Sequence, residues 1–291
     1  MFAITGITGH VGRVTGEILL NQHRPVRAVV RNPAKGTEWA ARGAAVTIAD
    51  LFDESALTEA FRGAEGVFIM TPPALDFENV IEQHQQMLDA ILGALKNARP
   101  EKVVYLSSIG GHLRKGTGAI RKLYDLEQAL TRLDIPTAGI RAGWFMENFT
   151  GSIPPAIQSG LLHSFLNPTD LLIPMIAVND IGKLAADLLA QSWTGPRIIE
   201  LEGPSRYSAD NVASILGYHT DRSISAVPIP GTDYEKVYSS FGFTQDASRL
   251  MAEMNDGFNR QWIVFEGSNT EHMCGETLLE DMLKAYLTKP S

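Results

Sequence analysis

Three glycines near the start of the chain, Gly6, Gly9 and Gly12, lie three residues apart in the stretch TGITGHVG. They follow a short apolar run and precede a segment with the apolar periodicity of a helix. In a strand–loop–helix setting the first glycine permits a tight turn, the second lets backbone approach a phosphate, and the third lets the helix pack on the strand. The spacing therefore predicts a cradle for the phosphates of a dinucleotide, with a plain glycine-rich turn as the alternative.

The residues between and beside these glycines lie where the predicted helix begins. Free backbone N–H groups and the helix dipole favour an anion at such a position. We therefore expect Thr8, His10 and Val11 to complete the phosphate cradle.

The end of the second predicted strand bears on the choice between NAD and NADP. An acidic side chain there would accept from the ribose 2′-hydroxyl, whereas a basic one accommodates a 2′-phosphate. The sequence VVRNPAK places Arg31 at the strand end and Lys35 nearby, with no acid between them. The planar guanidinium of Arg31 suits a phosphate. NADP(H) is therefore favoured over NAD(H), unless Arg31 is only a solvated charge.

Polar residues also follow the next three predicted strands. Asp50, with Leu51 after it, is placed to meet the adenine edge, and Thr71 and Pro72 to lie beside the nicotinamide ribose. Ser107 closes the fifth strand, at the edge where ligands of such sheets bind. A helix cap at Asp50, a simple turn at Thr71 and Pro72, and a capping hydroxyl at Ser107 remain the alternatives.

A second group of residues could contact a substrate. Trp144 and Phe145, in the stretch GWFMENF, could line a flat aromatic pocket, with Ser108 nearby and Asn148 orienting an acceptor oxygen. Tyr124 could face the nicotinamide. The alternatives are core packing for the aromatic stripe, a turn hydroxyl for Ser108 and a surface position for Tyr124.

Alternating strands and helices must position these residues. Apolar, valine- and isoleucine-rich segments alternate with helical patterns, which predicts an α/β fold with a Rossmann-type doubly wound parallel sheet over residues 1–150. We expect residues 151–291 to form a smaller C-terminal α/β substrate lobe, with segments around 172–202 rejoining the sheet. The expected strands of the first half are 2–5, 26–31, 45–50, 66–70, 102–108 and 136–141.

Composition narrows the function classes. A formal net charge of -8 over 291 residues disfavours direct contact with nucleic acid or an anionic membrane. The single cysteine excludes an intramolecular disulfide, and the scattered histidines give no metal-ligand spacing. The N-terminus lacks the pattern of a signal peptide and no apolar run is long enough to span a bilayer. We expect a cytoplasmic monomer or homodimer that acts on a small molecule.

The ordered set of motifs resembles the NmrA-like branch of the atypical short-chain dehydrogenases. The stretches that carry it are TGITGHVG, VRNPAK, VVYLSSIGGH, LTRLDIPTAGIRAGWFMENF, IAVNDIGKLAADLL and IELEGPSRYSADNVASIL, which extend over nearly the whole chain. The family includes NADPH-dependent quinone reductases, azo- and imine-type reductases, and redox-sensing regulators that bind the cofactor without turning it over. The resemblance implies the fold and the cofactor and leaves the substrate open.

The chain departs from short-chain dehydrogenases at the proton donor. Those enzymes typically carry Tyr-x-x-x-Lys on the helix after the fifth strand, but none of the seven tyrosines here has a lysine four residues later. Tyr124 and Lys122 are two residues apart and do not share a helix face.

The absence of a Tyr-x-x-x-Lys pair indicates which kind of acceptor the protein could reduce. Reduction of a simple ketone needs a positioned acid, whereas a reduced quinone is a much weaker base that water can protonate. We therefore expect an NADP(H)-dependent oxidoreductase that acts on a quinone or similar conjugated acceptor. The alternatives are a non-catalytic NADP(H)-sensing regulator with a protein partner and a reductase of imines or enones.

Overall fold

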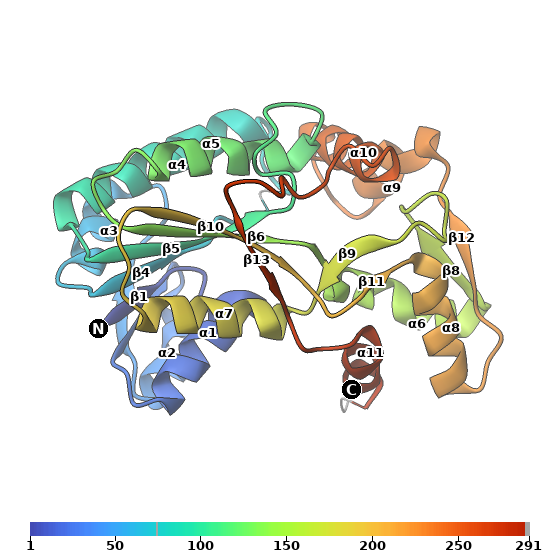
Figure 1. The fold of residues 1–291 in the computed structure, drawn as a ribbon, viewed down its shortest axis with the longest axis horizontal. Coiled ribbons are helices and arrows are strands. Elements are labelled where there is room, and N and C mark those ends of the chain that lie inside the picture. Colours follow the sequence, from blue (N-terminus) through green and yellow to red (C-terminus); the bar gives the residue numbers. More distant parts are fainter. Residues whose placement is uncertain (74, 289–291) are drawn as a thin grey trace.

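A computed structural model describes residues 1–73 and 75–288 of the chain. An eight-stranded parallel sheet runs through its centre (Figure 1). In spatial order its strands are β13 (Glu271–Cys274), β10 (Pro196–Glu202), β6 (Thr137–Ala142), β5 (Lys102–Ser108), β4 (Gly66–Ile69), β1 (Phe2–Ile4), β2 (Val26–Val30) and β3 (Ala45–Ile48). Because all neighbours are parallel, the loops that follow these strands meet at one edge of the sheet.

Helices cover both faces of the sheet, so the predicted doubly wound α/β fold is confirmed. One face packs against α1 (His10–Asn21), α2 (Pro33–Ala41) and α7 (Val178–Ala190), which lie below the sheet in Figure 1. The other face packs against α3 (Glu54–Phe61), α4 (Val80–Ala98) and α5 (Arg121–Leu130), which lie above it. Each face has its own buried apolar cluster, which explains why strands such as β4 and β6 are buried along their whole length.

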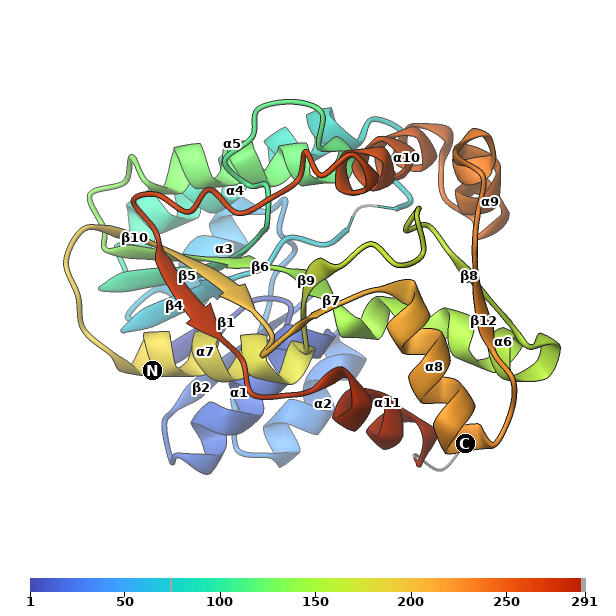
Figure 2. The same cartoon turned by 45° about the vertical axis from the view of Figure 1, so that its right-hand side comes forward.

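Beyond β6 the chain forms a second lobe with its own apolar core. Figure 2 brings this lobe forward, with α9 and α10 at one end and α6, α8 and α11 at the other. It contains two small sheets, β11–β9–β7 and β12–β8. The elements are β7 (Trp144–Phe145), α6 (Ile153–Ser159), β8 (Leu161–Ser164), β9 (Ile173–Ile176), β11 (Arg206–Tyr207), α8 (Ala209–Thr220), β12 (Ser225–Pro228), α9 (Tyr234–Ser240), α10 (Gln245–Asn259) and α11 (Leu279–Leu287). Short 3₁₀ turns span Gly118–Ile120 (η1), Met146–Ser152 (η2) and Gly231–Asp233 (η3).

The second half of the chain returns to the main sheet with two strands, β10 and β13. Helix α7 packs on α1, and β10 pairs with β6, in the region expected to rejoin the sheet. Strand β9 does not rejoin it and pairs instead with β7 and β11. The sequence analysis also missed β13, which forms the outer edge next to β10. All four residues of β13 are exposed, so the strand lacks the apolar pattern that reveals a buried one.

No helix in residues 1–73 and 75–288 is both long and apolar enough to cross a membrane. Two segments matter for the site because hydrogen bonds between them link the lobes: the start of α10 and the loop between β4 and α4. Thr244 caps α10 through its hydroxyl, which accepts from the N–H of Ala247, and the same hydroxyl donates to the carbonyl of Phe77 at 2.7 Å. Asp246 accepts from the N–H of Val80 at 2.9 Å. The second lobe therefore holds the loop that follows β4.

Candidate cofactor groove and acceptor cavity

The glycine loop between β1 and α1 is shaped by close backbone contacts. Gly6 has a φ of 61°, and a Cβ there would lie 2.4 Å from the terminal carbon of Met70. A Cβ at Gly12 would lie 2.4 Å from the carbonyl oxygen of Gly6, which is backbone and cannot rotate away. Both positions therefore need glycine, the first for its left-handed conformation and the second for the close approach of helix to loop.

The start of α1 offers unused hydrogen-bond donors. Gly9 is the N-cap residue, and no side chain caps the helix. The N–H groups of the first turn, which include those of His10, Val11 and Gly12, therefore have no intrahelical acceptor. Together with the helix dipole they favour an anion in front of the loop. This geometry fits the predicted phosphate cradle.

A groove of about 280 Å³ opens beside this loop, at the edge where β1, β2, β3 and β4 end. The predicted residues in its wall are Gly6, Thr8, Arg31, Asp50, Leu51 and Pro72. The guanidinium of Arg31 is exposed and makes no ion pair within residues 1–73 and 75–288. Asp50 accepts from the N–H of Phe52 at 3.0 Å, so its carboxylate also shapes the turn after β3. The opposite lip is formed by Asp76 and Phe77, in the loop that the start of α10 holds.

Three other predicted cofactor residues lie differently. Lys35 is exposed on α2 and does not line the groove. The Thr71 hydroxyl is buried and has no hydrogen-bond partner among the described residues, so it is available to a ligand next to Pro72. Ser107 is buried, and its hydroxyl donates to Glu127 Oε1 at 2.5 Å. The structure therefore does not place Ser107 in the groove, and its hydroxyl serves an internal network.

That network is centred on Arg141, at the end of β6. Its guanidinium binds Glu127 through Nε and Nη2 and donates from Nη1 to Glu266 at 2.6 Å. Burial lowers the pKa of Arg141, but the bonds and charges of Glu127 and Glu266 outweigh it and raise that pKa above its ordinary value. The arginine stays charged and ties α5 to the segment before β13. We assign this cluster a structural role.

Lys122, on α5, contacts the groove wall, and the sequence analysis did not propose it for the site. Its side chain is buried, and its Nζ donates to the carbonyl of Pro72, in the groove wall, at 2.7 Å. No carboxylate pairs with it among residues 1–73 and 75–288. Burial lowers the pKa of Lys122 to about 8. Burial, and then the Lys122 charge, lower the pKa of the neighbouring His84 to about 3, so His84 stays neutral.

Tyr124 lies elsewhere on the same helix. Its ring is 5.9 Å from the guanidinium carbon of Arg121, and it lines a shallow surface hollow with Gln85 and Arg114. It lines neither the groove nor the large cavity described next. On α5, Lys122 is buried and its Nζ reaches Pro72 in the groove wall, whereas Tyr124 is half-buried and faces the surface hollow.

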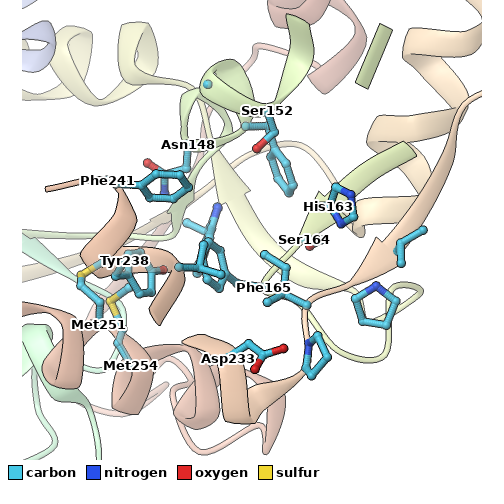
Figure 3. Close-up of a pocket in the computed structure, with 18 residues that line it drawn as sticks. Asn148, Ser152, His163, Ser164, Phe165, Asp233, Tyr238, Phe241, Met251 and Met254 are labelled. Atoms are coloured by element: carbon cyan, nitrogen blue, oxygen red, sulfur yellow. The ribbon is translucent and has the colours of Figure 1, made fainter. Parts of the chain in front are cut away.

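A larger cavity of about 950 Å³ lies in the second lobe (Figure 3). Residues from η2, β8, β12, α9 and α10 line it, and most of them are aromatic, aliphatic or methionine. Trp144 and Asn148 are in its wall, where a substrate role was expected. Phe145 is not, because its ring packs into the apolar cluster of the main sheet. Ser108 does not line it either.

The wall of the cavity that η2 forms lies close to the main sheet. Trp144 and Asn148 follow β6 directly, at the same edge of the sheet that bears the cofactor groove. The next residue of η2 in the wall, Phe149, is buried. Glu147 precedes Asn148 in η2. Both of its carboxylate oxygens accept from the N–H of Val178, at 3.0 and 3.1 Å, and so fix η2 to the start of α7. Its pKa is raised by burial.

The sequence profile of the NmrA-like family matches residues 1–269, and the chain belongs to this family. Quinone oxidoreductase 2 of Escherichia coli is 26% identical over 272 residues, which are 93% of this chain and 92% of that protein. An NAD(P)H azoreductase of Xenophilus azovorans is 24% identical over 254 residues, which are 87% of this chain and 86% of that protein.

Solved structures agree with the fold. The NADPH complex of the Escherichia coli quinone oxidoreductase superposes with a TM-score of 0.83 at 23% identity, covering 99% of this chain and 100% of that one. A triphenylmethane reductase of Citrobacter gives 0.82 at 19% identity, covering 99% of each chain. The predicted family and fold are thus confirmed, and the relatives support the predicted class, an NAD(P)H-dependent oxidoreductase.

Proposed function

We propose that this protein is an NADP(H)-dependent oxidoreductase that reduces a quinone or a similar conjugated small molecule. The observation that carries the proposal is the combination of two sites at one edge of the sheet. One is a glycine-loop groove with an arginine that pairs with no acid among the described residues, and the other is a large aromatic cavity. The names of two relatives, a quinone oxidoreductase and an NAD(P)H azoreductase, point to the same class of reaction.

The residues of the groove fit NADP(H). The first turn of α1 supplies N–H donors for the phosphates, and the exposed Arg31 supplies a planar, charged partner for a 2′-phosphate. Thr71 offers a buried hydroxyl without a partner. Lys122 fixes the carbonyl of Pro72 with one of its three N–H donors, which leaves two for a ligand beside it. When bound, NADPH supplies a hydride.

The cavity would hold the acceptor by shape and apolar contact. Trp144 presents an aromatic surface, and the amide of Asn148 can donate to an acceptor oxygen. A reduced quinone is a delocalised and weakly basic anion, so water can complete its protonation. The chain therefore needs no Tyr-x-x-x-Lys pair, and the main contribution of its residues is to hold two flat ring systems in contact.

The test is NADPH consumption with a neutral naphthoquinone, followed at the nicotinamide absorbance band. Asn148→Ala removes one hydrogen bond to the acceptor and should lower kcat/KM by roughly tenfold. Tyr124→Phe is the matched control, because Tyr124 lines neither site, and it should leave turnover unchanged. Tight NADPH binding by the wild type without any consumption would contradict the proposal and favour a cofactor-sensing regulator.

A further inference from the structure

The wall of the large cavity carries an uneven set of charges. Among the described residues that line it there is one carboxylate, Asp233, and no lysine or arginine. The other polar side chains in the wall are neutral hydroxyls and amides or the imidazole of His163. A ligand in this cavity therefore meets at most one fixed negative charge and no fixed positive partner for an anion.

The carboxylate of Asp233 has no hydrogen-bond or ion-pair partner in the part of the chain that the structure describes. Asp233 ends the turn η3 and is the N-cap residue of α9, but its side chain caps no N–H of that helix. It forms no ion pair within residues 1–73 and 75–288. Figure 3 shows Asp233 across the cavity from Asn148, with His163 on a third side. Asn148 follows β6 at the sheet edge, so Asp233 marks the side of the cavity opposite that edge.

The apolar part of the wall also favours a cation over an anion. The ring of Tyr238 stacks on Phe165 with centroids 4.4 Å apart and planes 6° apart. Phe241 also lines the cavity and is 63% exposed, which is unusual for a phenylalanine. The faces of aromatic rings carry partial negative charge and attract cations. Met251 and Met254 add polarisable sulfur.

The size of the cavity excludes a tight fit to a single ring. Its volume of about 950 Å³ lies near the upper end of small-molecule sites, which typically measure roughly 300–1,000 Å³. A one-ring acceptor bound at Asn148 would leave the region near Asp233 empty. The space between Asn148 and Asp233 suits an acceptor of several rings, or one ring with a substituent that reaches the carboxylate.

We propose that the cavity selects extended aromatic acceptors that are neutral or cationic at the end remote from Asn148, and that Asp233 is the residue that determines this charge preference. The proposal rests on the proposed function, because it takes the cavity as the acceptor site. It goes further because it specifies the charge of the preferred acceptors and names Asp233 as the residue that selects for that charge.

The test uses three naphthoquinones with one ring system and different side groups: an uncharged one, one with a sulfonate and one with a trimethylammonium-alkyl chain. Turnover with NADPH and direct binding by calorimetry are measured for the wild type, Asp233→Asn and Asp134→Asn. Asp134 is exposed, as Asp233 is. It lies in the loop before β6, at the opposite edge of the sheet, and lines no cavity described above. Its replacement removes the same net charge without touching the site.

We expect the wild type to prefer the cation to the anion in both kcat/KM and affinity. Asp233→Asn should reduce that preference by roughly fivefold, since exposed ion pairs contribute up to about 1 kcal/mol. Asp134→Asn should leave it unchanged. An unaltered preference in Asp233→Asn, or a wild type that takes the anion as well as the cation, would overturn the proposal.

The two readouts separate this proposal from the proposed function. If none of the quinones consumes NADPH but calorimetry ranks them by charge and loses that ranking in Asp233→Asn, the oxidoreductase function fails and the charge preference stands. If turnover occurs with all three quinones and Asp233→Asn changes no ratio, the charge preference fails and the oxidoreductase function stands.

Discussion

Replacing Lys122 with methionine should make the protein more stable and less able to bind NADPH. The lysine is buried, no carboxylate pairs with it among the described residues, and burial lowers its pKa from 10.5 to about 8. Methionine keeps most of the side-chain length without the charge. The stability gain and the binding loss should therefore both appear in one variant.

The magnitude follows from the difference between the folded and unfolded pKa. In the unfolded chain Lys122 keeps its proton up to about pH 10.5, whereas in the folded protein it loses the proton near pH 8. Between these values the unfolded state binds more protons, so the stability of the wild type rises with pH. The rise amounts to about 3 kcal/mol, from about 1.4 kcal/mol for each pKa unit.

Lys122→Met avoids this penalty but also removes the donor of the Pro72 carbonyl, and leaving an acceptor without its partner costs about 1–3 kcal/mol. Below pH 8 Lys122→Met should therefore be more stable than the wild type by about 1 kcal/mol. By pH 10.5 the order should reverse.

Urea unfolding of both proteins at several pH values between 7 and 10.5 measures this difference. Lys96→Met serves as the control, because Lys96 is exposed on α4 and its replacement should give no such pH dependence. Calorimetry should show NADPH affinity reduced by roughly tenfold in Lys122→Met. A wild-type-to-variant difference that is flat across this pH range, or that moves in the opposite direction, would refute the reasoning.

Three further variants test the groove. Arg31→Ala should weaken NADPH by about tenfold and leave NADH nearly unchanged, because only the 2′-phosphate needs the guanidinium; equal losses in calorimetry would remove Arg31 from that role. Gly12→Ala places a Cβ 2.4 Å from the Gly6 carbonyl and should destabilise the fold by about 1–3 kcal/mol in denaturant, with both dinucleotides weakened; unchanged stability would show that the loop has room. Thr244→Ala removes the bond to Phe77 and the cap of α10 and should loosen the lip of the groove, so that NADPH binds a few-fold more weakly; an unchanged Kd would mean that this lip does not contribute to binding.

The sequence allowed accurate prediction wherever a local pattern determines the structure. The apolar strands and their alternation with helices predicted the main sheet, because strands buried on both faces need continuous apolar residues. The glycine spacing predicted a loop whose geometry is dictated by close contacts at Gly6 and Gly12. Arg31 lies in the groove wall, as its position at the end of one strand predicted, and its contact with a 2′-phosphate stays a prediction.

The errors fall where distant parts of the chain determine a residue's role. Ser107 was predicted in the groove, but Glu127 from the next helix accepts its hydroxyl. Phe145 was predicted in the substrate pocket, yet its ring packs into the main core, while its neighbour Trp144 faces the cavity. Lys122 was missed because a lysine in the polar pattern of α5 indicates an exposed side chain, and the Pro72 carbonyl that accepts from its Nζ lies 50 residues earlier in the chain.

The acceptor cavity could be predicted only in part. Trp144 and Asn148 come from a segment next to the main sheet and could be proposed from their position. Asp233, Tyr238 and Phe241 lie 85 to 97 residues further along the chain and reach the cavity only because η3, α9 and α10 fold back toward η2 and β8. No local sequence pattern marks that return.

The central claim is that one chain binds NADPH in the groove and passes its reducing equivalents to a conjugated acceptor. The most direct measurement is a titration of the purified protein with NADPH and with NADH, followed by the loss of nicotinamide absorbance on addition of a neutral naphthoquinone. We predict that NADPH binds more tightly than NADH and that the quinone consumes it. Preferential binding of NADH, or stable NADPH in the presence of every quinone tested, would contradict the account.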